Sequence, residues 1–160
     1  MSVTRLSDKQ KSHAEDPGKS VITALESVLM ATYDLTVTTQ LAHWNAQGAN
    51  FIAFHLLTEK QYGELFETVD VLAERIRQLG RSVPLNATGE FIVKGTLINN
   101  DVRQATKQLI EMHEAGSEKA RAAADLADEA SDIGTNDILV DCVKFHDKAA
   151  WMLRASLSAG

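Results

Sequence analysis

The chain has 160 residues, a formal net charge of −6 and a single cysteine, Cys142. This length suits one domain with its own hydrophobic core, and the acidic balance argues against a body that grips nucleic acid by itself. One cysteine excludes an intramolecular disulfide and fits a reducing cytosol. No apolar run reaches the roughly 18 residues that span a bilayer, and the polar N-terminus lacks a signal-peptide core. We therefore expect a cytoplasmic protein without a membrane partner.

Residues 1–15 are polar and mixed in charge, which predicts a flexible tail ahead of a single domain over residues 16–160. Asp16 and Pro17 are typical of the N-cap and the first position of a helix. Beyond them, apolar residues recur at three-, four- and seven-residue spacings and predict one amphipathic helix that ends near Asn45. These residues are Val21, Leu25, Val28, Leu35 and Ala42.

A second helix is expected from Phe51 to about Leu79, with Asn50 as its cap and glycine and proline residues after its end. Residues 81–98 then form a long connection with three glycine or proline breakers. The apolar piece Phe91-Ile92-Val93 inside this connection predicts a short helix packed over the other helices.

Asn99 or Asn100 is the predicted cap of a third helix, which Gly134 is expected to break, and a fourth helix is expected to begin near Thr135. Apolar seams mark both helices. They are Val102, Ala105, Leu109, Met112, Gly116 and Ala123, and then Ile138, Cys142, Phe145, Ala149 and Met152. Four long helices without an alternating strand pattern indicate an all-α four-helix bundle, and the long crossover suggests the ferritin-like topology.

Metal-ligand residue types gather on the first two helices. His43 lies at the end of the first, while His55 and Glu59, and then Asp70 and Glu74, are four residues apart and so stack on one face of the second. His55 and Asp70 are separated by roughly 22 Å of helix. One ion cannot be bound by both ends of a rigid helix, so a metal site either does not exist or is completed by a second copy of the chain.

A second copy solves this problem with simple geometry. Fifteen residues at about 100° each leave a net rotation of about 60°, so His55 and Asp70 face the same side of the helix. A two-fold axis near Tyr62 and Gly63 would place His55 of one chain opposite Asp70 of the other, with two identical sites per dimer. Gly63 has no side chain and would let the two helices approach closely.

The usual ferritin-like di-iron centre needs Glu-x-x-His pairs that project into the bundle. None of the five histidines has a glutamate three residues before it, so this in-bundle site is missing. The absence strengthens the intersubunit alternative. His13, His113 and His146 have no partner pattern and are expected to be structural or on the surface.

Motifs from Pro17 onward carry a family resemblance, and the spacing of their histidines and acids is highly specific. The motifs are His43-Trp44-Asn45, Gly48, Phe51, His55, Tyr62, Asp70, Ala73-Glu74-Arg75-Ile76 and Trp151-Met152-Leu153-Arg154-Ala155. Together they resemble the signature of the mini-ferritins, also called DNA-binding proteins from starved cells (Dps).

The resemblance implies a homododecameric shell in which His43 and His55 of one chain face Asp70 and Glu74 of a two-fold mate. It also implies two irons at each intersubunit site, oxidation of Fe(II) preferentially with hydrogen peroxide, and storage of the ferric product inside. The protein would then be a ferroxidase that protects against oxidative stress. Imidazole and carboxylate ligands suit iron on chemical grounds alone. Glu59 could hold the second iron, at a position where family members often have Asp.

Other residues leave two interpretations open. Trp44 is either a packing aromatic or a radical sink beside the iron. The acidic cluster near the fourth helix is either a helix-capping region or the lining of iron-entry pores, with Asp132 and Asp137 as the best pore candidates. The cluster comprises Asp125, Asp128, Glu129, Asp132, Asp137 and Asp141.

The tail before Pro17 has three basic and three acidic side chains, a balance of zero. A shell of twelve such chains would carry a charge of about −72, so we expect DNA binding to be weak and confined to low salt or to pH below about 6.5. Two alternatives stay open. One is an architectural nucleoid protein that compacts DNA with a vestigial metal site, and the other is a metal-free helical scaffold.

Overall fold

The computed structural model describes residues 17–83, 95–97 and 99–157. Within these ranges the chain forms four α-helices, which confirms the predicted all-α class. The helices are α1 (Pro17–Asn45), α2 (Phe51–Gln78), α3 (Val102–Glu129) and α4 (Ile133–Leu157). The predicted tail over 1–15 and the short helix expected at 91–93 lie outside the described residues.

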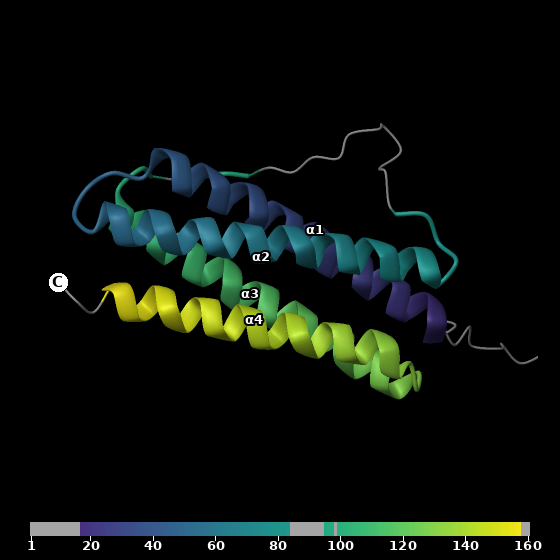
Figure 1. Ribbon diagram of the computed structural model, residues 1–160. Helices are drawn as coiled ribbons and strands as arrows, with labels where there is room; N and C mark the ends of the chain where they lie inside the picture. Colours follow the sequence, from purple (N-terminus) through teal and green to yellow (C-terminus); the bar gives the residue numbers. More distant parts are fainter. Residues whose placement is uncertain (1–16, 84–94, 98, 158–160) are drawn as a thin grey trace, which may run out of the picture.

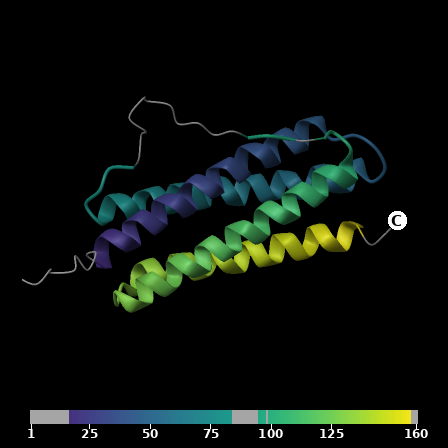
Figure 2. The same cartoon turned by 180° about the vertical axis from the view of Figure 1, so that it is seen from behind.

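The helices form two hairpins, α1 with α2 and α3 with α4, that pack into one bundle (Figures 1 and 2). A backbone exchange joins the α1–α2 turn to the start of α3: Gln47 donates to Asn100 O at 2.6 Å, and Val102 donates to Gln47 O at 3.0 Å. α3 starts at this end of the bundle and α2 ends at the other (Figures 1 and 2), as the predicted ferritin-like crossover requires.

The predicted seam of α1 is confirmed, because all five of its apolar residues are buried. Residues Gly18–Asn45 are also long and apolar enough to resemble a membrane span by composition. Nearly half of that apolar window is buried inside the bundle, as expected for a core helix. The apolar character of α1 is therefore accounted for by packing against α2 and α3.

Of the two predicted helix caps, one is confirmed in position and the other is corrected. Asn50 is the N-cap residue of α2, although its φ of 64° is left-handed and its side chain makes no capping hydrogen bond. The cap of α3 is Asp101, rather than Asn99 or Asn100, because its carboxylate accepts the Gln104 N–H at 3.1 Å. Asp101 directly precedes the first residue of α3, so its carboxylate can accept hydrogen bonds from the unpaired backbone N–H groups of the first helical turn.

Gly134 does not break the third helix as predicted; it lies in the first turn of α4. The break comes earlier, at Ser131, whose φ is 57°. Ser131 N–H donates to Asp128 O and Asp132 N–H donates to Ala127 O, both at 2.8 Å, which is the pattern of a Schellman motif. The glycine was a misleading signal because backbone hydrogen bonds hold a serine in the left-handed conformation instead.

A pair of histidines lies in the centre of the bundle. His113 of α3 and His146 of α4 are 0% and 1% exposed, and their Nδ1 atoms are 3.0 Å apart. Phe145 packs edge-on against both rings, and Gly116 leaves room for the ring of His146, since a Cβ there would lie 3.0 Å from it. The sequence predicted that His113 and His146 are structural or on the surface and have no partner pattern. Both are buried in the structure, and the two rings contact each other.

Burial keeps both imidazoles neutral. Desolvation lowers the pKa of His146 to about 4, and desolvation together with the proximity of His146 lowers the pKa of His113 to about 3. In the unfolded chain both groups take up protons near pH 6.5. Between these values the unfolded state binds more protons than the folded state, so stability must fall as the pH falls.

We therefore predict an acid-sensitive core. The free energy of unfolding, measured by urea titration, should be constant above about pH 7.5 and decrease from about pH 6.5 downward, on the order of several kcal/mol by pH 4. A His113→Leu/His146→Phe double variant should lose most of this dependence. Phe145→Leu, which alters the same contacts without a titrating group, should shift stability equally at pH 7 and pH 4.5. An unchanged acid dependence in the double variant would contradict the prediction.

Candidate metal centre

His43 and His55 are held in a reciprocal arrangement where α1 ends and α2 begins. The Nδ1 atom of each ring lies 3.0 Å from the backbone oxygen of the other residue. A carbonyl oxygen can only accept, so each Nδ1 carries a proton, and in the neutral imidazole the lone pair is then on Nε2. This is the tautomer that a histidine needs to bind a metal through Nε2, with a backbone carbonyl fixing the ring from behind.

The local sequence explains why the two residues meet. Gly48, with φ 117°, and Asn50, with φ 64°, reverse the chain within a few residues of the end of α1. Ala46 N–H still bonds to Ala42 O, so α1 stays regular up to the turn. The two histidines are consequently brought to the same level, one on each helix. The predicted placement of both histidines at this junction agrees with the structure.

Two further residues, which the sequence did not assign to the site, support the pair. Thr58 is fully buried; its hydroxyl donates to Phe54 O or His55 O and lies 3.5 Å from the Nδ1 of His43. Tyr62 packs edge-on against the His43 ring, with centroids 5.3 Å apart. Thr58 and Tyr62 follow His55 by three and seven residues, a spacing that places all three on the same helical face. This spacing is the sequence signal from which their support of the site could have been predicted.

The two rings are stacked, with centroids 3.7 Å apart and an angle of 17° between their planes. A metal ion bound by an imidazole lies close to the plane of that ring, about 2 Å from the nitrogen. The two nearly parallel planes do not meet within that range. His43 and His55 as arranged therefore cannot share one ion, although each can bind an ion of its own.

The predicted carboxylates lie on α2 and do not join the histidines. Glu59, Asp70 and Glu74 are all exposed. Among residues 17–83, 95–97 and 99–157, no group of three or more His, Cys, Asp or Glu side chains converges on a point that could hold a metal ion. One chain thus supplies two imidazoles at one end of α2 and two carboxylates farther along, as the helical rise requires.

An exposed seam runs along α2 opposite its buried face. Its residues repeat at alternating four- and three-residue spacings and are Ile52, Leu56, Glu59, Gly63, Phe66 and Asp70. Ile52, Leu56 and Phe66 are 66%, 59% and 61% exposed, and a Cβ on Gly63 would meet no atom within 4 Å. Sequence reasoning picked out Gly63 on this seam but missed its apolar residues, although their heptad spacing is visible in the sequence.

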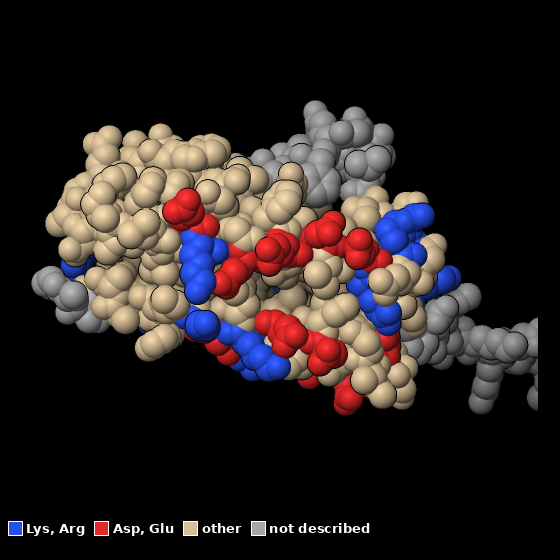
Figure 3. Space-filling model, viewed as in Figure 1, with Lys and Arg blue, Asp and Glu red and all other residues tan. Residues whose placement is uncertain are grey.

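Charged side chains are unevenly distributed over the face in Figure 3. Carboxylates form rows along α2 and α4, while the end of the molecule around the α1–α2 turn is almost without charge. The sequence agrees, since no Asp, Glu, Lys or Arg occurs between Asp34 and Glu59. Trp44, at the end of α1, is 65% exposed in this uncharged region, so it is not a core residue of the single chain.

Asp132 of the acidic cluster is engaged in a clamp between α2 and α4. Its carboxylate accepts from Arg75 at 2.6 Å, and from the backbone and hydroxyl of Thr135 at 3.1 and 2.5 Å, which caps α4. Burial by itself raises the pKa of Asp132, but the bonds from Thr135 and the Arg75 guanidinium outweigh it and leave the pKa below its usual value. Of the two interpretations, these contacts favour helix capping for Asp132. Asp137 is exposed on α4.

Comparison with known proteins places this site in context. Residues 22–159 match the family model of the ferritin-like domain. The DNA protection during starvation protein of Agrobacterium fabrum is 33% identical, over 92% of this chain and 94% of that protein. An uncharacterized low temperature-induced protein of Nostoc sp. is 35% identical, over 88% of this chain and 82% of that protein.

Two solved structures superpose on nearly the whole chain. Dps from Thermosynechococcus elongatus has a TM-score of 0.81 and 29% identity, covering 90% of this chain and 94% of its own. Dps from Vibrio cholerae, a member of a broad superfamily of ferritin-like diiron-carboxylate proteins, has a TM-score of 0.77 and 26% identity, covering 92% of this chain and 99% of its own. Both likenesses agree with the helix order and crossover described above.

The clamp generates a stability prediction. Asp132→Asn keeps the shape of the side chain but removes the charge that pairs with Arg75, so it should lower the free energy of unfolding by about 1–3 kcal/mol. Asp137→Asn, on the exposed face of the same helix, should change it by less than about 0.5 kcal/mol. Urea titration at pH 7 measures both. Equal effects of the two substitutions would show that the clamp adds no stability.

Proposed function

Because this chain belongs to the Dps family of mini-ferritins, we propose that it is a cytoplasmic ferroxidase and iron store. It oxidises Fe(II) at sites formed between two subunits and keeps the ferric product inside a hollow homododecamer. Fe(II) is the substrate and hydrogen peroxide the preferred oxidant. Fe(II) and hydrogen peroxide together generate hydroxyl radicals. Consuming both of them limits this reaction and so protects against oxidative stress.

The single observation that carries this proposal is the reciprocal histidine pair. In their neutral form both rings present an Nε2 lone pair, and their stacked geometry suits one ion on each ring, which supports a two-iron site. Binding Fe(II) through His43 and His55 needs no rearrangement of the backbone, because the carbonyl of each residue already orients the other ring. Imidazole and carboxylate ligands together suit ferrous iron.

The missing ligands come from a second copy of the chain. When two α2 helices pack antiparallel along the exposed seam, with Gly63 near the two-fold axis, Asp70 and Glu74 of one subunit approach His55 of the other. The apolar residues of the seam supply the contact surface, since an exposed apolar stripe of this kind marks an interface. Glu59, one turn beyond His55, would hold the second iron.

The chemistry follows from having two ions side by side. Each Fe(II) gives one electron to the same hydrogen peroxide molecule, and with two protons the products are two Fe(III) ions and two water molecules. Paired delivery of electrons avoids the one-electron reduction that releases hydroxyl radical. The carboxylates from the partner neutralise the charge that builds up on the ions, and the few protein ligands leave positions open for the oxidant.

DNA binding remains the alternative, and the Agrobacterium fabrum relative is a DNA protection protein by name. The basic and acidic side chains of residues 1–16 balance, and the described surface carries rows of carboxylates. Retention of DNA at physiological salt by an iron-inactive variant would favour an architectural nucleoid protein. Loss of retention between low and physiological salt is the outcome that we expect.

Subunit mixing tests the intersubunit site. His43→Ala/His55→Ala and Asp70→Ala/Glu74→Ala should each abolish fast peroxide-driven iron oxidation without changing the size of the shell. When the two inactive proteins are dissociated and reassembled together, each mixed dimer regains one site with all ligands intact. Activity should return, as followed by the absorbance of ferric iron. Mixed dimers that stay inactive would place the ligands elsewhere.

Assembly offers an independent prediction. Gly63→Leu inserts a side chain where two α2 helices meet and should weaken assembly by about 1–3 kcal/mol through overpacking. Ala122→Leu adds one carbon atom fewer, on the exposed face of α3, and should leave assembly unchanged. Light scattering at decreasing protein concentration reports both. A wild-type protein that is a stable 17.5 kDa monomer at micromolar concentration would contradict the shared site.

A further inference from the structure

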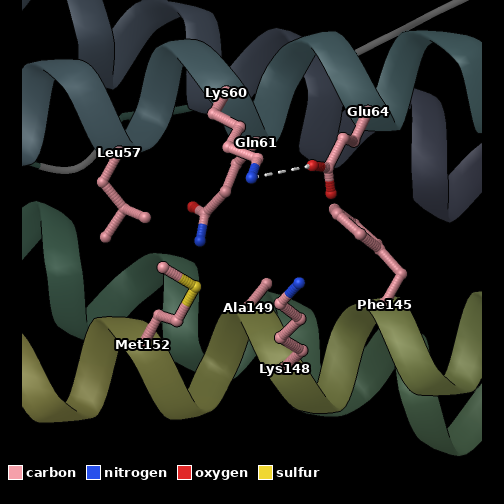
Figure 4. A pocket seen from close by; sticks show the side chains of 8 residues that line it. All are labelled: Leu57, Lys60, Gln61, Glu64, Phe145, Lys148, Ala149 and Met152. Carbon is pink, nitrogen blue, oxygen red and sulfur yellow. Dashed lines mark ion pairs between the residues drawn. The ribbon is translucent and has the colours of Figure 1, made fainter.

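A small pocket lies between α2 and α4 (Figure 4). Its volume is about 20 Å³, enough for one molecule the size of water or hydrogen peroxide. Leu57 and Phe145 form apolar walls, while Lys60 and Lys148 contribute polar edges. The packing between α2 and α4 is the sparsest of the major helix contacts, which explains why a pocket remains there.

Gln61 of α2 is the buried polar residue of this pocket. Its side chain is only 4% exposed, yet neither its Nε2 nor its Oε1 has a hydrogen-bond partner within the described part of the chain. A buried amide left unpaired is costly, and Leu would fill the position without that cost. The amide offers one donor and one acceptor side by side, which matches a small molecule that can both donate and accept.

Met152 of α4 faces this amide. In Figure 4 the thioether of Met152 and the amide of Gln61 point toward one another across the pocket. A thioether is a soft nucleophile that peroxide oxidises to the sulfoxide. We propose that the pocket holds hydrogen peroxide on Gln61 and directs it to the sulfur of Met152, which makes Met152 a site of reversible oxidation. This reaction uses no iron and does not depend on the proposed ferroxidase site.

The step balances without another reagent. The sulfur lone pair of Met152 attacks the nearer peroxide oxygen, an S–O bond forms and the O–O bond breaks. The sulfur is oxidised by two electrons, and the departing oxygen takes the proton of the transferred one and leaves as water. The Nε2–H of Gln61 donates to the departing oxygen, while its Oε1 accepts from a peroxide O–H and orients the molecule.

The product fits the same pocket. A sulfoxide oxygen is a strong acceptor, and on Met152 it would lie beside the Nε2–H donor of Gln61, which has no partner among the described residues. Oxidation of a buried methionine usually disrupts packing because it introduces an unpaired dipole. Here the new dipole gains a partner, so oxidation should leave the bundle folded and allow a sulfoxide reductase to restore the thioether.

The test is oxidation of the iron-free assembled protein by hydrogen peroxide in the presence of a chelator. Peptide mass spectrometry gives the rate at which each methionine gains one oxygen. Met152 should react roughly fivefold faster than Met112, which is half-buried as well, since one additional hydrogen bond in the transition state is worth about that factor. In Gln61→Leu the Met152 rate should fall to that of Met112, whose own rate should not change.

Gln61→Leu removes an unpaired polar group and is expected to fold, which circular dichroism and particle size verify. A second readout is the unfolding temperature after oxidation. It should be nearly unchanged in the wild-type protein and clearly lowered in Gln61→Leu, where the sulfoxide has no donor. Met152 reacting no faster than Met112, or reacting equally fast with and without the Gln61 amide, would overturn the proposal, as would equal losses in unfolding temperature.

Discussion

The rigid rise of α2 is the constraint on which the proposed chemistry depends. It carries His55 at one end, the Asp70 carboxylate roughly 22 Å away on the same side and Glu74 one turn farther, so these ligands cannot meet on one ion within one subunit. The exposed seam between them provides the surface on which a second α2 can pack. In the proposed dimer, catalysis and assembly are linked, because the contact that buries the apolar residues also brings the separated ligands together.

The α1–α2 turn supplies the precision that such a shared site needs. Since each histidine ring is oriented by the backbone of the other, the neutral pair is held in the tautomer that the proposed metal binding needs. Preorganisation of this kind lowers the entropy cost of the proposed metal binding. The carboxylates of the second subunit would still have to be positioned by the subunit interface. The hydroxyl of Thr58, which is fully buried, lies next to the Nδ1 of His43 and helps to hold that ring in place.

The bundle interior carries more polar groups than packing requires. His113, His146 and Gln61 are buried with atoms that have no hydrogen-bond partner within the described part of the chain. Unpaired buried polar atoms of this kind make a fold less stable than apolar side chains would. The histidines make stability depend on pH, and the amide creates a polar pocket between the two hairpins.

The sequence by itself determined the helix order, the crossover, the buried seam of α1 and the identity and spacing of the candidate ligands, because helical periodicity is a local property. Tertiary structure decided what depends on contacts between distant residues. It placed Asp101 rather than Asn99 or Asn100 at the cap of α3, and moved the α3–α4 break from Gly134 to Ser131 through backbone hydrogen bonds. It also paired His113 with His146, 33 residues apart, and stacked the two site histidines. Spacing along a chain predicts which residues share a helix face, but only packing decides which faces meet and how each ring is turned.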